Sequence, residues 1–351
     1  MNTLIRADGS VHLGLGHIMR CLALAQGLEK IGVSSVFTIR DYEPKVAELI
    51  RRCNFEVELI PRGCDLKEDL LLTLELVSQY QVKLIIADLC NNDTLANIDE
   101  FSQYLQGLKD GGRFLLTLDD LKAIPFPGDI LINPNYGAEN WDHGFGSNTK
   151  YLLGPAYFIF RQEFIEAARV EREIKTDAKN VLIAIGGSDP FDLTGKVVRV
   201  LSKLTLNLHI VLGIDYTESK ERELDETLKH CQGNYKLVRV ADNLTELMLW
   251  ADLAITGGGL TKYETAVTGT PSIIIPQVDY LAELVREFER EGTALNLGLA
   301  DSVGESDIIK AVERLLKDSA LRALMSQRGK KLVDGRGIER IISEIPGEVL
   351  S

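Results

Sequence analysis

The chain has 351 residues, of which 45% are hydrophobic and 26% charged, and its formal net charge is −13. This composition excludes a disordered protein, and the acidic balance, with no compensating basic stretch, excludes a nucleic-acid-binding protein. The five cysteines form no CxxC pair, which is typical of reduced thiols and argues against a disulfide framework or a zinc site. Because no apolar run could span a membrane and no signal-peptide pattern is present, we expect a cytoplasmic protein.

The chain opens with an expected strand, a glycine-rich turn and a helix. The strand covers 3–7, Gly14 and Gly16 follow it, and apolar residues recur with helical spacing after His17. Glycines let a ligand approach the backbone, and the first turn of a helix presents free N–H groups to an anion. A dinucleotide fingerprint would need a third glycine at the position of Met19, so the pattern does not support NAD binding.

His17 is the candidate catalytic residue, because a neutral imidazole at the start of a helix can accept a proton at neutral pH. Asp8, Gly14, Gly16 and Arg20 belong to the same stretch and are assigned with it to substrate binding. A glycine turn after a first strand is also common in α/β proteins, so a purely structural role for the turn stays open.

Strand and helix patterns alternate through the first half of the chain, which predicts a parallel sheet covered by helices. The expected strands are 36–39, 55–60, 84–87, 114–118 and 130–133, and the expected helices are 44–53, 66–79 and 95–109. Ligands of such sheets bind beyond the carboxyl ends of the strands. Asp88 and the pair Asp119 and Asp120 follow two strands, where each carboxylate either faces a ligand or anchors a loop. The turn-rich segment 133–148 is expected to form a loop near the site, with His143 in solvent.

A charged run at 171–179 is the best linker candidate, and it predicts two domains, residues 1–173 and 174–351. The second domain repeats the pattern of the first. A strand at 181–185 ends in the turn 186–190, and a helix follows from Leu193.

The strongest pattern of the second half is a strand that ends in Gly257, Gly258 and Gly259, with a helix from Thr261. Backbone N–H groups at such a turn could hold a pyrophosphate. Glu264, one helical turn further, could accept hydrogen bonds from both hydroxyls of a ribose. Thr261 and Glu264 also have the spacing of a capping box, which needs no ligand, and both interpretations stay open.

The chain resembles the UDP-2,4-diacetamido-2,4,6-trideoxy-β-L-altropyranose hydrolases of pseudaminic acid synthesis and the related spore-coat polysaccharide proteins. The matching stretches include RADGS, GLGHIMRCLALA, YLLGPAYFIFRQEF, IAIGGSDPFDLTGK, ADLAITGGGLTKYETAVTGTPSIII and LVDGRGIERI. The resemblance implies an α/β protein of the GT-B fold, with two Rossmann-like parallel-sheet domains facing each other across a cleft. The first domain would carry His17, the second would bind the nucleotide, and the last helix would cross back.

The resemblance also implies a metal-free hydrolase without a cofactor, in which His17 activates water and UDP leaves the anomeric carbon of an amino or deoxy sugar. The residues implied in binding substrate or nucleotide are Asp8, Gly14, Gly16, Arg20, Gly187, Ser188, Gly258, Gly259, Leu260, Thr261, Glu264 and Tyr280. The expected partner is a small nucleotide-sugar, with no nucleic acid and no integral membrane segment, and a monomer is expected. The alternatives are a glycosyltransferase with a UDP-sugar donor, a non-catalytic nucleotide-sugar-binding protein and a 2-epimerase.

Two places depart from the family pattern. Cys90 stands where the family has a tyrosine, and Tyr280 and Leu281 stand where it has Asn-Gln. An Asn side chain both donates and accepts hydrogen bonds, and Leu281 does neither. We therefore expect a sugar that differs from the diacetamido-trideoxy-altrose in its N-acyl or C6 substitution.

Overall fold

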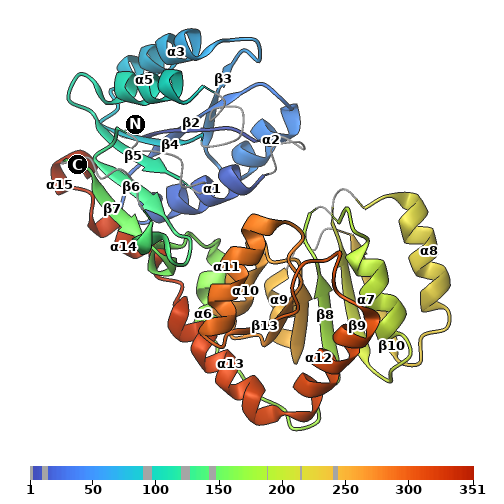
Figure 1. Ribbon diagram of the computed structural model, residues 1–351. Coiled ribbons are helices and arrows are strands. Elements are labelled where there is room, and N and C mark those ends of the chain that lie inside the picture. The colour runs from blue at the N-terminus through green and yellow to red at the C-terminus, as the bar shows by residue number, and fades with distance from the viewer. Residues whose placement is uncertain are drawn as a thin grey trace. The chain divides into compact units, whose positions relative to one another are not determined.

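The computed structural model describes residues 3–9, 15–89, 97–119, 127–141, 148–187, 189–213, 216–239 and 244–351. The chain forms two compact units, drawn in Figure 1. One consists of Met1–Gln162 with Arg336–Ser351, and the other of Glu163–Gly335. Each unit has its own parallel sheet with helices packed on it, as the alternation of strand and helix patterns predicts.

The sheet of the first unit has the strand order β3-β2-β1-β4-β5-β6-β7, and every neighbouring pair is parallel. Its strands are β1 (Thr3–Ala7), β2 (Ser35–Arg40), β3 (Glu56–Ile60), β4 (Leu84–Asp88), β5 (Phe114–Leu118), β6 (Ile130–Asn133) and β7 (Lys150–Leu153). Its helices are α1 (Gly16–Glu29), α2 (Pro44–Arg52), α3 (Leu66–Gln79), α5 (Ile98–Lys109), α14 (Gly337–Ser343) and α15 (Gly347–Leu350), and η1 (Ala138–Asn140) and η2 (Pro155–Tyr157) are short 3₁₀ turns. The strands expected in the first half are confirmed, each to within one residue at either end.

The helices of the first unit cover both faces of its sheet. Figure 1 shows α3 and α5 on one face and α1 and α2 on the other. A capping box starts α3, because Asp65 accepts hydrogen bonds from the N–H groups of Lys67 and Glu68 while Glu68 accepts one from Asp65. On the other face α1 packs against α14, and a Cβ on Gly27 would lie 2.4 Å from Ile338 Cγ2. The absence of a side chain at Gly27 lets α14 pack closely on α1, so the last residues of the chain belong to the first unit.

The sheet of the second unit has the order β10-β9-β8-β11-β12-β13 and is also parallel throughout. Its strands are β8 (Asn180–Ala184), β9 (Asn207–Leu212), β10 (Asn234–Arg239), β11 (Leu253–Thr256), β12 (Ser272–Ile274) and β13 (Ala294–Asn296). Its helices are α6 (Gln162–Ala168), which starts at the boundary, α7 (Leu193–Leu201), α8 (Glu218–Leu228), α9 (Leu244–Trp250), α10 (Thr261–Val267), α11 (Asp279–Arg290), α12 (Glu305–Lys317) and α13 (Ser319–Leu332).

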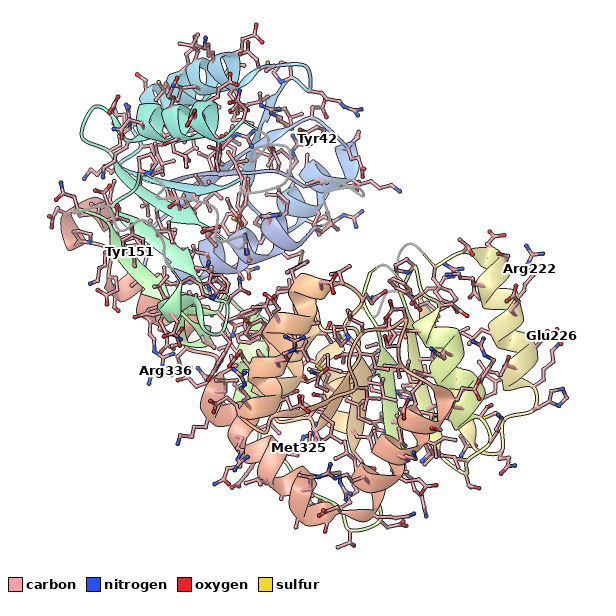
Figure 2. All side chains as sticks on the ribbon, in the orientation of Figure 1. Tyr42, Tyr151, Arg222, Glu226, Met325 and Arg336 are labelled. Carbon is pink, nitrogen blue, oxygen red and sulfur yellow. The ribbon has the colours of Figure 1, made fainter. Side chains whose placement is uncertain are left out.

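Helix pairs of the second unit enclose a large apolar core. α7 packs between α8 and α12, and α10 packs against α13. Met325, labelled in Figure 2, belongs to this core. Arg222 and Glu226, also labelled there, lie on the exposed side of α8, where Leu224 and Leu228 face the core instead. Among the described residues, no helix is long and apolar enough to cross a membrane.

The division between the units lies between Gln162 and Glu163, earlier in the chain than the boundary expected between 173 and 174. The reason is that the side chains of three cationic residues bind the connecting segment, residues 168–179, to the second unit. Arg172 donates to backbone oxygens of Met248, Ala251 and Thr268. Lys330 donates to the carbonyls of residues 168 and 170, and the buried Arg322 donates to that of residue 175. The charged run at 171–179 therefore belongs to the second unit.

Candidate functional site

In each sheet the chain first adds strands on one side of its first strand and then crosses to the other side. Several candidate residues lie near this topological switch point. In the first unit β1 is followed by β2 and β3 on one side, and the chain then crosses to β4 on the other side of β1. In the second unit β8 and β11 flank the equivalent place. Crevices at the carboxyl ends of such strands are the usual ligand sites of open α/β sheets. His17 lies on the helix that comes after β1 in the chain, and the three-glycine turn follows β11.

At the switch point of the first unit, His17 meets Asp88. Asp88 is the last residue of β4 and lies beside Ala7 of β1 in the register of the sheet. Its side chain is fully buried, and its Oδ1 lies 2.7 Å from Nδ1 of His17, whose side chain is 19% exposed. His17 is in the first turn of α1, whose N-cap residue Leu15 makes no side-chain capping hydrogen bond. The parallel pairing of β1 with β4 therefore forms a His–Asp pair.

Arg20 completes this group. One helical turn after His17, it donates through Nε to Asp88 Oδ2 at 2.5 Å and through Nη2 to Oδ1 at 2.6 Å. Burial opposes ionisation of Asp88, but the charges and hydrogen bonds of Arg20 and His17 outweigh it and hold the pKa of Asp88 well below its usual range. Burial, and then the charge of Asp88, raises the pKa of the Cys21 thiol, which donates to Oδ2 at 3.5 Å.

The ionised carboxylate fixes the tautomer of His17. A carboxylate without a proton only accepts hydrogen bonds, so Nδ1 of His17 carries the hydrogen and donates it to Asp88. Nη2 of Arg20 also lies 3.1 Å from this nitrogen, but Nδ1–H offers no lone pair, and both groups instead donate to Asp88 Oδ1. In the neutral imidazole Nε2 is then the basic nitrogen. This is the arrangement of a general base oriented by a carboxylate.

Asp8 belongs to a different group of charges. It pairs with Arg6, with 2.6 Å between Nη1 and Oδ1, and accepts a hydrogen bond from the backbone N–H of Arg40. Arg6 is 1% exposed and also pairs with the buried Asp69 on α3, which accepts a hydrogen bond from Tyr104 on α5. Both oxygens of Asp8 therefore bind the ends of β1 and β2, and no described contact joins Asp8 to the group around His17.

The three-glycine turn of the second unit is tied to β8. The N–H of Gly257 donates to the carbonyl of Ile185 at 3.0 Å, and a Cβ on Gly257 would lie 2.3 Å from that oxygen. Gly258 has φ +82°, in the left-handed region, and a Cβ there would crowd Val285. Among the described residues, the backbone N–H groups of the next positions, Gly258 to Thr261, make no hydrogen bond. The turn therefore offers consecutive donors at the carboxyl edge of the sheet.

The capping-box interpretation of Thr261 and Glu264 is wrong. Leu260 is the N-cap of α10 and no side chain caps the helix, so Thr261 is already the first helical residue. Glu264 then lies beyond the position from which a capping-box carboxylate reaches back to the N-cap. Both side chains are half-buried. A capping box therefore does not account for a glutamate at position 264.

The other expected binding residues of the second unit lie at the same edge of its sheet. Gly187 follows β8 and is exposed, and Tyr280, 58% exposed, is in the first turn of α11 after β12. Leu260 is 52% exposed, and Gly259 has room for a Cβ. The residues that fall outside the described ranges are Gly14, Ser188, Cys90, Asp120 and His143. Within those ranges, no three His, Cys, Asp or Glu side chains are grouped to hold a metal ion.

Comparison with solved structures identifies the fold. The crystal structure of MurG from Acinetobacter baumannii superposes with a TM-score of 0.68 at 12% identity, covering 98% of this chain and 99% of that one. The glycosyltransferase of kitacinnamycin superposes with a TM-score of 0.65 at 16% identity over 98% of this chain and 99% of its own. The chain has the GT-B fold. The two parallel-sheet α/β domains that the resemblance implies are thus confirmed.

Sequence comparison agrees with this GT-B assignment. Residues 181–339 match the glycosyltransferase family 28 C-terminal domain. The spore coat polysaccharide biosynthesis protein SpsG of Bacillus subtilis is 29% identical over 347 residues, which cover 97% of this chain and 96% of SpsG. The UDP-2,4-diacetamido-2,4,6-trideoxy-β-L-altropyranose hydrolase of Campylobacter jejuni is 25% identical over 250 residues, covering 71% of this chain and 81% of the hydrolase. Both groups of relatives that the motifs suggested are therefore found.

One residue of each unit, Asp88 in the first and Lys262 in the second, can be linked to the site only from the tertiary structure. Asp88 was one of several strand-end carboxylates, and its position beside His17 follows from the pairing of β4 with β1. Lys262 follows the glycine turn as the second residue of α10 and is buried. The sequence offers one signal for Lys262, a cation three positions after the last glycine, but its burial depends on the packing of α10.

Proposed function

We propose that the chain is a nucleotide-sugar hydrolase that releases UDP from a UDP-activated amino or deoxy sugar in surface-polysaccharide or nonulosonic acid biosynthesis. The observation that carries the proposal is the group formed by His17, Asp88 and Arg20, which supplies an oriented base in the first unit. The match of residues 181–339 to a glycosyltransferase domain and the resemblance to a named UDP-sugar hydrolase support the choice of substrate.

In the proposed reaction Nε2 of His17 takes a proton from water while the water oxygen bonds to the anomeric carbon. The bond between that carbon and the diphosphate oxygen breaks, and UDP leaves with the electron pair. Asp88 donates no proton but stabilises the imidazolium that forms, because its carboxylate remains ionised beside Nδ1. A positioned general base typically accelerates such a step about 10²–10⁴-fold.

In this proposal the second unit binds the nucleotide. The N–H groups of Gly258, Gly259, Leu260 and Thr261 would donate to the diphosphate, whose charge grows as the sugar departs. Glu264 would accept hydrogen bonds from the ribose hydroxyls. Tyr280, exposed at the same edge of the sheet, would contact the sugar.

If Glu264 binds the ribose, its substitution should weaken UDP binding. Glu264→Ala should weaken UDP binding at least ~10-fold, because a hydrogen bond to a charged group contributes about 1.5–3 kcal/mol. Calorimetric titration with UDP and with 2′-deoxy-UDP tests the contact itself. In the wild type the deoxy compound should bind more weakly than UDP, and in the variant the two should bind alike. Equal UDP affinity in the variant and the wild type would show that Glu264 has no part in the nucleotide site.

A glycosyltransferase is the second candidate function. The family match of residues 181–339 and the superposition on MurG favour it directly. In that case His17 would deprotonate an acceptor hydroxyl instead of water. Incubation with a panel of UDP-sugars without any acceptor separates the two functions, because only the hydrolase releases UDP at full rate.

The same incubation in ¹⁸O-water identifies the bond that breaks. If His17 directs water to the anomeric carbon, mass spectrometry should find the label in the sugar product and none in UDP. Label in the phosphate of UDP would mean attack at phosphorus, and the proposed mechanism would fail. Commercial UDP added without enzyme is the control for exchange into phosphate.

A further inference from the structure

Lys262 lies beneath the glycine turn. It is 3% exposed, although it directly follows the first residue of α10. Its Nζ donates to the carbonyl oxygens of Gly258 and Gly259, each at 3.1 Å. The ammonium also lies 4.7 Å from the ring centroid of Tyr263 and 5.8 Å from that of Phe288, whose rings pack edge to face. Aromatic faces attract a cation and favour this buried position.

These two hydrogen bonds determine how the peptide groups of the turn point. The peptide bonds of the described residues are all trans, so each carbonyl points opposite to the N–H of the next residue. Because the oxygens of Gly258 and Gly259 point inward to Nζ, the N–H groups of Gly259 and Leu260 point away from the interior. Leu260 is 52% exposed, which agrees with this direction. Neither N–H makes a hydrogen bond within the described part of the chain.

We infer that Lys262 is the positioning residue of the diphosphate site: it holds two carbonyls inward so that two adjacent N–H groups face an anion. The inference rests on the proposed function and adds to it a residue that does not touch the ligand. Gly258 supports the arrangement, since its φ of +82° brings the two successive carbonyls to one side. Successive N–H groups in such a turn form an anion-binding concavity. The buried positive charge adds attraction for a doubly or triply charged diphosphate that a neutral ligand does not feel.

The ligand pair UDP and uridine tests this role, because the two differ only in the diphosphate. Lys262→Met keeps an unbranched apolar side chain that is one atom shorter, and it removes the charge and the hydrogen-bond donors. The variant should bind UDP at least ~10-fold more weakly than the wild type, the loss expected for disordered hydrogen bonds to a charged group. Uridine binding, followed by NMR titration because it is weaker, should change less than about twofold.

Lys330→Met is the matched control. Lys330 also donates to two backbone carbonyls of the second unit, those of Ala168 and Val170, which lie on the connecting segment. Its replacement should lower the melting temperature and leave the UDP and uridine affinities in their wild-type ratio. If Lys262→Met weakens both ligands equally, or leaves UDP binding unchanged, the inference is overturned.

If Lys262→Met does not fold, an NMR titration of the wild type tests whether the N–H groups of the turn bind the diphosphate. With ¹⁵N-labelled glycine and leucine, the amide signals of Gly259 and Leu260 should shift on addition of UDP and stay in place with uridine. Unmoved signals at saturating UDP overturn the inference. A wild type that binds no UDP at all overturns the proposed function, whereas UDP binding that is insensitive to Lys262 overturns the inference alone.

Discussion

His17→Asn is expected to lower kcat at least ~10²-fold, because asparagine cannot take the proton that the attacking water loses. Its amide is close in size to the half of the imidazole that faces Asp88, and the ion pair of Asp88 with Arg20 is unchanged. UDP affinity should therefore remain near the wild-type value. Steady-state turnover of the best UDP-sugar from the panel, together with calorimetric UDP titration, measures both quantities.

The control for this variant is His230→Asn, which changes an exposed histidine after α8 in the second unit. It should retain wild-type kcat and KM. Turnover near the wild-type rate in His17→Asn would remove His17 from the mechanism. A parallel loss of UDP affinity would point to disruption of the fold instead of loss of a base.

Asp88→Asn is expected to lower kcat at least ~10²-fold as well, although Asp88 does not touch the substrate. An uncharged amide no longer favours the tautomer with hydrogen on Nδ1, and it no longer stabilises the imidazolium. Since the pKa of Asp88 lies well below its usual range, the wild-type carboxylate is ionised at every pH at which a histidine titrates. The limb of the pH–rate profile that reports the base should therefore move to lower pH in the variant.

Asp69→Asn is the matched control, since Asp69 is another fully buried carboxylate of the first unit that pairs with arginine. Burial opposes its ionisation, but Arg6 and Tyr104 lower its pKa, so its loss should destabilise the fold. We expect a lower melting temperature with kcat unchanged. If Asp88→Asn kept wild-type kcat and pH profile, Asp88 would have only the structural role of Asp69.

Local patterns in the sequence were sufficient for the fold class and for much of the candidate site. Buried parallel strands are rich in apolar residues, so β1, β5 and β6 could be located to the residue. Glycine turns between a strand and a helix are local as well, which is why His17 and the turn at Gly258 stood out. Four strands were not located. The short β13 and the exposed edge strand β10, where Tyr235 is 46% exposed, carry no apolar run, whereas β7 and β9 were missed although they contain apolar residues.

The sequence by itself determined which residues are available for chemistry, and the tertiary structure decided which of them meet. His17 and Asp88 are 71 positions apart, and only the adjacency of β1 and β4 brings them within a hydrogen bond. Asp8, in the same stretch as His17, is instead drawn into the buried charges around Arg6. Strand order and side-chain burial depend on packing between distant segments, because no local periodicity records which strand lies beside which.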